Sequence, residues 1–432
     1  MTLPPPSVAD RHAPLRAVLL VANPAAPYSR GLRVARSLHD RGFDVEIAAV
    51  AGDDQPSEET EGGIVTRRYR PASRWSRFRA RPSGRPILRQ LRWLRYRIAG
   101  IVAWPIHVRD WWETLERELP PADLYHAFGI LTIPIALVLA RRARAAGRQG
   151  RVVYDVIDVI LESNNYDRVP RPALAFFRWR ERRWARSADA IVTVNDPIAD
   201  HLARCWPWRD RPTVLLNCQP RWTPPSQRPD HIRSATGIPP ERRVVLFLGR
   251  LGRERGLEEA AAAVLQLDDA ALVMLGFGPW ADELRERDRD PAHVGRHFTL
   301  PPVHPDDVPA WTASADVSII AVPANSLNQR LSTPNKFWES LTAGTPVVVG
   351  RDLEVMRAIV EEHGLGAVAD PNDPDDLARA LRELLDGEPG AIDARRARCL
   401  AITRDRYNWE TAVQPYLALV AGLTGQPGST PR

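Results

Sequence analysis

Two glycine-containing segments in the second half of the chain carry residues suited to an anionic ligand. Gly249 and Arg250 end an apolar run, and Arg255 follows five residues later. Gly276 and Gly278 end the next apolar run. Glycine lets a ligand approach the backbone, and guanidinium groups donate paired hydrogen bonds to phosphate. The two loops together predict a diphosphate site, although each alone is also typical of an ordinary turn in an arginine-rich chain.

A third segment, residues 332–349, predicts a polar loop, a short helix and a buried strand. Lys336 is the only lysine among 59 Lys and Arg residues, which favours a site that needs a compact ammonium rather than a planar guanidinium. Chance placement of one leftover lysine is the alternative. Glu339 lies one helical turn on and suits the cis-diol of a ribose, or else it is simply part of the helix surface.

Strands and helices alternate in two consecutive halves, and this alternation must position the three segments. Apolar runs predict strands at 17–22, 43–50, 124–126, 152–157, 190–194 and 213–216, then at 244–248, 272–275, 298–300, 317–321 and 346–349. Helical spacing is expected at 31–41, 87–119, 131–146, 173–186 and 198–205, then at 257–267, 281–288, 354–362, 375–385, 392–405 and 409–423. This order predicts an α/β fold with two parallel, doubly wound sheets and ligands at the carboxyl ends of their strands.

The charge of the chain is uneven. Net charge is +6, yet residues 62–108 contain no acid, and the segment from Arg67 to Arg97 is rich in arginine and aromatic residues. This profile favours a helix on an anionic membrane surface, and an arginine-coated helix packed over the first sheet is the alternative. Nucleic acid is not expected, because no readout motif accompanies the charge.

The remaining composition concerns compartment and metal chemistry. Three cysteines without metal-ligand spacing fit a reducing cytoplasm, and we expect no signal peptide and no membrane-spanning helix, leaving peripheral attachment to the inner membrane face open. Aspartates at 53–54 and 373–376 read as turn and cap residues, so no metal site is predicted.

Taken together, the motifs resemble those of the GT-B-fold glycosyltransferases, most closely the retaining family-4 group. The resemblance covers nearly the whole chain. It rests on Gly249-Arg250 with Arg255, on Gly276-Phe277-Gly278-Pro279, on Pro334-Asn335-Lys336-Phe337-Trp338-Glu339, on Ala343-Gly344-Thr345-Pro346-Val347-Val348, and on Tyr407-Asn408-Trp409-Glu410.

The resemblance implies two Rossmann-like domains that face each other across a cleft. It implies an acceptor-binding domain at 15–219, with a basic insertion at about 62–118. The residues themselves predict a disordered tail at 1–14 and, from four prolines, a linker at 220–229. A nucleotide-sugar-binding domain would then span 230–405, followed by a helix at 406–424 that crosses back to the first domain and a tail at 425–432.

The resemblance also implies roles for the residues of the donor site. Arg250 and Arg255 would hold the diphosphate and Glu339 the nucleotide ribose, with Gly249, Gly276, Gly278, Asn335 and Lys336 around them. The donor would be a nucleotide-diphosphate sugar, with no further cofactor, and the sugar would pass with retention and without a metal.

Two positions depart from the family pattern. Leu331 stands where the family has its first glutamate, so the loop 325–333 is expected to bind the donor sugar, with Asn328, Gln329, Ser332 or Thr333 as the substitute. His126 would contact the donor sugar near the reacting carbon, and Phe128 replaces the second histidine of a His-x-His segment. A histidine satisfied within the core is the alternative for His126.

The acceptor side is less marked in the sequence. Ser29, Arg30 and Gly31 lie where the family places acceptor or phosphate contacts, and Asp158 and Glu162 follow a strand end of the same half. A glycan, a lipid-linked glycan or a small molecule would serve as acceptor. Two readings compete with the transferase: a sugar-nucleotide epimerase, and a catalytically silent homologue that binds a partner. Leu331 and Phe128 keep the silent homologue open.

Overall fold

The computed structural model describes residues 14–25, 28–52, 55–71, 109–167, 169–388 and 390–425. The chain forms two compact units. The first groups residues 1–157, 169–192 and 417–432, and the second groups residues 158–168 and 193–416. Most of the basic segment from Arg67 to Arg97 lies outside the described residues.

An eight-stranded sheet organises the first half of the chain, in the order β3-β4-β2-β1-β5-β6-β7-β8. β3 pairs antiparallel with β4, whereas β4, β2, β1, β5 and β6 pair in parallel. The strands are β1 (Arg16–Val21), β2 (Asp44–Val50), β3 (Glu58–Glu61), β4 (Ile64–Tyr69), β5 (Leu124–Phe128), β6 (Arg151–Val156), β7 (Ala190–Thr193) and β8 (Thr213–Val214). β3 and β4 were not expected: the start of the predicted basic insertion instead extends the sheet.

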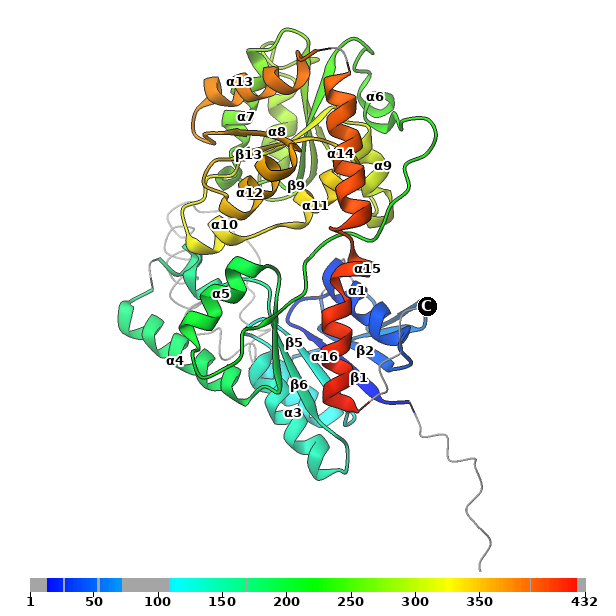
Figure 1. Cartoon of the computed structure of the whole chain (residues 1–432), viewed down its shortest axis with the longest axis vertical. Helices are drawn as coiled ribbons and strands as arrows, with labels where there is room; N and C mark the ends of the chain where they lie inside the picture. Colours follow the sequence, from blue (N-terminus) through cyan, green and yellow to red (C-terminus); the bar gives the residue numbers. More distant parts are fainter. Residues whose placement is uncertain are drawn as a thin grey trace, which may run out of the picture. The chain divides into compact units, whose positions relative to one another are not determined.

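Helices pack on this sheet at nearly the predicted positions. Figure 1 shows α3 beside β5 and β6, which it contacts. A further helix is described from residue 109 to residue 118, the end of the helical segment expected at 87–119. The others are α1 (Ser29–His39), α3 (Ile133–Ala145), α4 (Arg171–Ser187) and α5 (Asp196–Cys205), with short 3-10 turns η2 (Ile160–Glu162) and η3 (Asn164–Tyr166).

A six-stranded parallel sheet organises the second half, in the order β11-β10-β9-β12-β13-β14. Its strands are β9 (Arg243–Arg250), β10 (Ala270–Phe277), β11 (His297–Leu300), β12 (Val317–Ile320), β13 (Val347–Gly350) and β14 (Gly366–Ala369). β14 was missed by the sequence reading. The central strands are buried on both faces, which explains their continuous apolar sequences.

The helices of the second half include three short ones that the sequence did not indicate, namely α6 (His231–Thr236), α9 (Val308–Ala313) and α10 (Leu327–Leu331). The expected ones are α7 (Leu257–Leu265), α8 (Ala281–Arg287), α11 (Asn335–Thr342), α12 (Glu354–His363), α13 (Pro374–Leu385) and α14 (Ala391–Asp405). α7 and α13 pack together over a buried cluster that includes Leu257, Val264 and Leu381.

The predicted last helix is two helices, α15 (Trp409–Ala412) and α16 (Gln414–Thr424). The chain nevertheless returns to the first unit as expected, since residues from Leu417 onward belong to it. Within that unit, the Gln149 side-chain amide donates a hydrogen bond to the Thr424 carbonyl oxygen over 3.0 Å.

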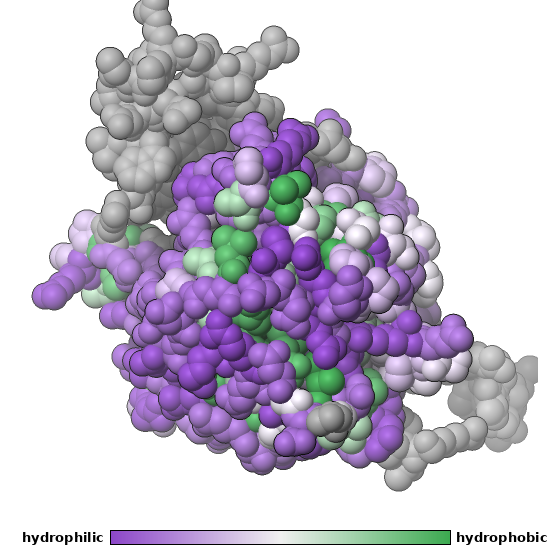
Figure 2. All heavy atoms as spheres, turned by 90° about the horizontal axis from the view of Figure 1, so that it is seen from above, coloured by the Kyte–Doolittle hydropathy of each residue, from purple (hydrophilic) through white to green (hydrophobic). Residues whose placement is uncertain are grey.

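Figure 2, seen from above the view of Figure 1, shows a surface that is mostly hydrophilic, with hydrophobic residues in small separate groups. Among the described helices, none is both long enough and apolar enough to cross a bilayer.

Candidate active site

The ends of β9 and β10 approach each other so closely that only glycine fits. A Cβ atom on Gly276 would lie 1.8 Å from the Gly249 carbonyl oxygen, and one on Gly278 would lie 2.1 Å from the Leu251 carbonyl oxygen. Gly249 itself has a φ of 114°, a value that side-chain-bearing residues rarely adopt. The predicted glycine loops therefore form adjacent strand ends with bare backbone, as a phosphate cradle requires.

Lys336 lies in the first turn of α11, where no acidic side chain competes for a bound anion. Its Nζ atom stands 4.1 Å from the centre of the Phe247 ring on β9, although the residue as a whole is only partly covered. Burial lowers the pKa of the Lys336 ammonium to about 7, and the charge of Arg255 lowers it further, while Glu339 raises it. The Lys336 side chain therefore loses its proton near neutral pH, and a bound anion would favour the protonated form.

Arg255, Lys336 and Glu339 interact electrostatically, so two of the three predicted segments meet at one place. Arg255 is half-buried and its Nε atom, 3.5 Å from Glu254, has no hydrogen bond within the described residues. Glu339 accepts a long hydrogen bond, of 3.5 Å, from the Gln219 side-chain amide. Arg250 ends β9, exposed and opposite Phe277 in the strand register.

A stretch after β8 holds the start of α11 in place. The Asn217 side-chain amide donates to Asn335 Oδ1 over 2.7 Å, and the Trp409 backbone N–H donates to the Gln219 carbonyl oxygen over 2.9 Å. Asn335 is therefore occupied in supporting the helix start, a role that the sequence did not reveal.

The segment that precedes α11 is pinned to residues of the first half of the sequence. Leu331 has a buried side chain, and its carbonyl oxygen accepts a 2.7 Å hydrogen bond from the Asn195 side chain. Asn164 donates to Gln329 over 3.1 Å, and Asn328 donates to Asp158 over 3.2 Å. Where the family has its first glutamate, this chain thus has a packed apolar residue in a fixed backbone.

Ser332 and Thr333, two of the four expected substitutes, follow Leu331. The Ser332 hydroxyl donates to the Gln329 carbonyl oxygen over 3.1 Å. Thr333 is buried, and its hydroxyl has no partner within the described residues, so it could accept or donate to a ligand.

His126 lies in a buried triad within the first unit. Its Nε2 atom is 3.1 Å from Asp155 Oδ2, and the guanidinium of Arg30 grips the same carboxylate through Nε at 2.9 Å and Nη2 at 3.1 Å. His126 and Asp155 are fully buried and Arg30 is 3% exposed. This arrangement is the satisfied core histidine that the sequence left as an alternative, and the sugar-contact role of His126 stays a prediction.

Arg30 was expected among the acceptor contacts, yet in this structure its Nε and Nη2 atoms both donate hydrogen bonds to Asp155. Its neighbours are no more open: the Tyr28 ring lies over Gly31, 2.4 Å from where a Cβ would be. Ser29 starts α1, and Glu162 ends η2. The sequence offered no sign of the Arg30–Asp155 pair, whose members are 125 residues apart.

Metal ligation has no support in the residues that the structure describes, since no group of three or more His, Cys, Asp or Glu side chains is placed to hold an ion. The aspartates around 373 behave as predicted: Asp373 caps α13 by accepting from the backbone N–H groups of Asp375 and Asp376.

Comparison with known proteins agrees with this geometry. A family model described as "Glycosyl transferases group 1" matches residues 242–387, and one described as "Glycosyl transferase 4-like domain" matches residues 29–218. The GDP-mannose-dependent alpha-(1-6)-phosphatidylinositol monomannoside mannosyltransferase of Mycobacterium tuberculosis is 31% identical over 304 residues, covering 67% of this chain and 72% of that protein. The 2-deoxystreptamine glucosyltransferase of Streptomyces kanamyceticus is 25% identical, covering 70% and 79%.

Solved structures show the same fold. Sucrose-phosphate synthase from Thermosynechococcus elongatus superposes with a TM-score of 0.68 at 16% identity, covering 95% of this chain and all of that one. Anabaena HepE in complex with UDP gives a TM-score of 0.64 at 17% identity, covering 94% of this chain and all of that one.

Proposed function

Because the chain belongs to the family-4-like GT-B glycosyltransferases and is therefore an enzyme that uses nucleotide sugar donors, we propose how it transfers the sugar. The donor diphosphate binds at the ends of β9 and β10 and at the start of α11. The sugar passes to an acceptor hydroxyl with retention of the anomeric configuration. No divalent metal takes part, because cationic side chains and a helix start neutralise the departing phosphate.

The observation that carries this proposal is the electrostatic coupling of Arg255, Lys336 and Glu339 beside bare glycine backbone. Two cations and the N–H groups at the start of α11 form a site for a diphosphate. The nearby carboxylate suits a diol and not a phosphate, so the ribose lies toward Glu339. The ligand is therefore a nucleoside diphosphate whose sugar ring and phosphates are read by different side chains.

In the reaction, the bond between the anomeric carbon and the diphosphate oxygen breaks, and negative charge grows on that oxygen. Arg250, Arg255 and Lys336 stabilise this charge, which is where electrostatic catalysis is worth most. The acceptor hydroxyl attacks from the same face and gives its proton to the leaving phosphate. No protein nucleophile is required, so catalysis consists of positioning and charge stabilisation.

The acceptor and the donor are best sought from the relatives. GDP-mannose and a phosphatidylinositol mannoside are the substrates named for the M. tuberculosis protein, and they are the first pair to test here. A small-molecule acceptor, as named for the S. kanamyceticus protein, is the second.

Ligand-dependent melting tests the donor site directly. UDP, GDP, dTDP and ADP, each with its sugar conjugates, are compared by thermal shift, and the correct nucleotide raises the melting temperature. Arg255→Ala and Arg250→Ala should each lower the affinity for that nucleotide by roughly 10- to 100-fold, which is the contribution of one hydrogen bond to a charged group. Arg253→Ala is the matched control, because Arg253 is paired with Glu283 at 2.5 Å and stacks on Trp280. No shift with any nucleotide would remove the donor-site assignment.

The role of Glu339 has its own test. Glu339→Gln should lower the affinity for the nucleoside diphosphate but leave the affinity for inorganic diphosphate unchanged, because only the nucleotide carries a diol. Calorimetric titration of both ligands measures this difference, and equal losses for both would contradict the ribose role. Product analysis by NMR establishes the anomeric outcome, and turnover that survives EDTA supports a reaction without metal.

A further inference from the structure

The helix α4 of the first unit is far more exposed and more basic than its neighbours. Ala185 is its only buried residue among those described, although the helix spans Arg171–Ser187. It contains six arginines and a single acid, Glu181, which accepts a 2.8 Å hydrogen bond from the Tyr154 hydroxyl. A helix that buries so little is held only along one edge and presents the rest to its surroundings.

Two large aromatic side chains on α4 are also exposed. Phe176 is 54% exposed and Trp179 is 52% exposed, and their rings lie 5.9 Å apart. They make up two of the four large apolar side chains found exposed in the described residues, the others being Phe277 and Val294. Exposed aromatic pairs of this kind are typical of interaction surfaces rather than of freely solvated helices.

The aromatic pair and two arginines share one face of α4. Phe176, Trp179, Arg180 and Arg183 are spaced i, i+3, i+4 and i+7, which places them on one stripe of a helix. Ala185 falls on the opposite side by the same geometry. α4 therefore carries a stripe that combines cations with interfacial aromatics.

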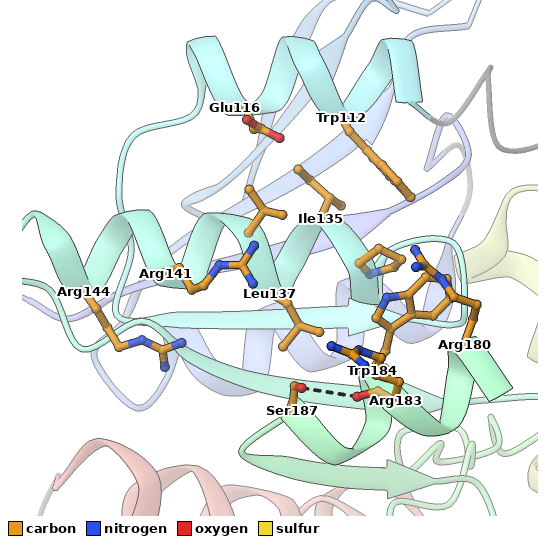
Figure 3. Close-up of a pocket in the computed structure, with 12 residues that line it drawn as sticks. Trp112, Glu116, Ile135, Leu137, Arg141, Arg144, Arg180, Arg183, Trp184 and Ser187 are labelled. Atoms are coloured by element: carbon orange, nitrogen blue, oxygen red, sulfur yellow. Dashed lines mark hydrogen bonds between the residues drawn. The ribbon is translucent and has the colours of Figure 1, made fainter.

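A cavity of about 500 Å³ lies beside this stripe, between α3, α4 and the helix at 109–118. Figure 3 shows arginine side chains from α3 and α4 along it, with Arg144 at one end and Arg180 with Trp184 at the other. Its basic lining is Arg141, Arg144, Arg180 and Arg183, and Glu116 is its only acid.

These arginines lack acidic partners. In the part of the chain that the structure describes, no carboxylate forms an ion pair with any of the four. Arg144 donates to the Gly150 carbonyl oxygen over 3.1 Å, and Arg180 stacks on Trp184 at 4.8 Å. Glu116, the acid of the lining, pairs instead with Arg142 at 4.0 Å, and Arg142 does not line the cavity. Four neighbouring cations repel one another, and a bound anion removes that repulsion.

We propose that α4 and this arginine-lined cavity form a docking surface for a bilayer that contains anionic phospholipid. A lipid phosphate sits among Arg141, Arg180 and Arg183, because guanidinium groups bind phosphate oxygens in pairs. Phe176 and Trp179 enter the interface beside it, where the indole of a tryptophan is favoured and a phenylalanine ring reaches the acyl chains. The exposed aromatics argue for a lipid rather than a soluble phosphate, which would leave them in water.

This surface is distinct from the basic segment 67–97 and from the donor site. It consists of described residues of the first unit alone, whereas the proposed diphosphate ligands belong to the second. Its test is consequently independent of the proposed reaction: the donor nucleotide still binds if the docking surface is wrong.

Vesicle co-sedimentation of the full chain tests the proposal. Vesicles of phosphatidylcholine alone are compared with vesicles that also contain phosphatidylglycerol. We expect binding to the anionic vesicles only, and Arg180→Gln with Arg183→Gln to weaken it by roughly 30-fold, at about one kcal/mol per basic residue. Phe176→Ser with Trp179→Ser also weakens it, and this loss persists at high salt because it is not electrostatic.

A matched control is Arg285→Gln with Arg289→Gln, which removes the same charge from the second unit and should leave vesicle binding unchanged. A cooperative thermal melting transition at the wild-type temperature shows that each variant folds. Three results would overturn the proposal: equal binding to neutral vesicles, full binding by both α4 variants, or a melting shift by inorganic phosphate that needs Arg183 while vesicles do not bind. The last result would identify a soluble phosphate ligand instead.

Discussion

The guanidinium of Arg30 grips the carboxylate of Asp155 with two hydrogen bonds, of 2.9 and 3.1 Å, where neither side chain meets solvent. A bidentate pair at this depth is fully desolvated, so each charge depends on the other. Since Asp155 is the last but one residue of β6 and Arg30 is the second residue of α1, the pair fixes the helix start against the strand end. It thereby sets the position of the loop around Ser29, where the family places acceptor contacts.

Removing one member of this pair should be costly. Asp155→Asn removes the carboxylate that balances the buried Arg30 charge, and we expect the free energy of unfolding to fall by about 3–5 kcal/mol. Urea denaturation measures the change. The control is Asp44→Asn, because Asp44 pairs with Arg16 at 3.4 Å with 58% of its side chain exposed, and it should cost about 1 kcal/mol or less. Equal losses in the two variants would show that the buried pair is not needed for stability.

The third member of the triad predicts a dependence on pH. Burial lowers the pKa of the His126 imidazole, and the positive charge of Arg30 adds to this, while the hydrogen bond that the Asp155 carboxylate accepts from the imidazole opposes it. The folded protein therefore binds that proton less readily than the unfolded chain, whose histidines titrate near about 6.5. Stability is fully present above that pH and is lost as the pH falls below it.

We expect the melting temperature to fall between pH 7 and pH 5.5, and His126→Gln to reduce that fall. His297 contributes as well, since burial lowers its pKa to about 4, so His297→Gln serves as a second, separate comparison. Asp155 does not act in this window: burial favours its neutral form, but Arg30 and His126 together hold its pKa below the ordinary value. A wild-type melting temperature that stays constant over this range would contradict a lowered pKa for the His126 imidazole.

Much of the fold could be predicted from the sequence, because the buried parallel strands are continuous apolar runs. The failures have physical reasons. β3 consists of Glu58-Glu59-Thr60-Glu61, all exposed and mostly poor strand formers, and only its pairing with β4 makes it a strand. The break before α16 had a visible signal, since Pro415 has no backbone N–H to continue the preceding helix and is tolerated in the first turn of a new one.

The candidate site divides in the same way. Residue type and spacing were enough to predict the glycines at 249, 276 and 278 and the segment around Lys336. The Arg30–Asp155 pair did not, because it joins distant segments through a fold that the sequence only outlines. The basic character of α4 was visible, but its exposed aromatic stripe required the knowledge of which face is buried.

Lys336 predicts that donor binding takes up a proton. The pKa of its ammonium is about 7 because of burial and of Arg255, and a bound diphosphate raises it again. Between pH 7.5 and 9, where the nucleotide phosphates have already lost their protons, affinity should fall by roughly tenfold per pH unit. Calorimetry of the preferred nucleoside diphosphate in buffers of different ionisation enthalpy measures the proton uptake.

The variant Lys336→Arg separates charge from size at this position. Arginine stays protonated throughout, so proton uptake should vanish and the pH dependence should flatten. Its larger planar group cannot occupy the space 4.1 Å above Phe247 in the same way, so we also expect slower sugar transfer. Full activity together with an unchanged pH profile would show that Lys336 neither titrates nor contacts the donor.

Two glycine-to-alanine changes, one at the close approach of β9 and β10 and one in an open position of α16, should have opposite effects on stability. In Gly276→Ala the new Cβ would lie 1.8 Å from the Gly249 carbonyl oxygen, and the atoms that it meets are all backbone, which cannot turn aside as a flexible side chain can. We expect a large loss of stability, with the strand ends displaced and nucleotide binding abolished. In Gly422→Ala the new Cβ meets nothing within 4 Å, and the residue lies inside α16, so the change should stabilise the protein by about 0.5–1 kcal/mol. Thermal melting with and without nucleotide reports both effects, and a Gly276→Ala protein that still binds nucleotide with wild-type affinity would show that the diphosphate does not rest on these strand ends.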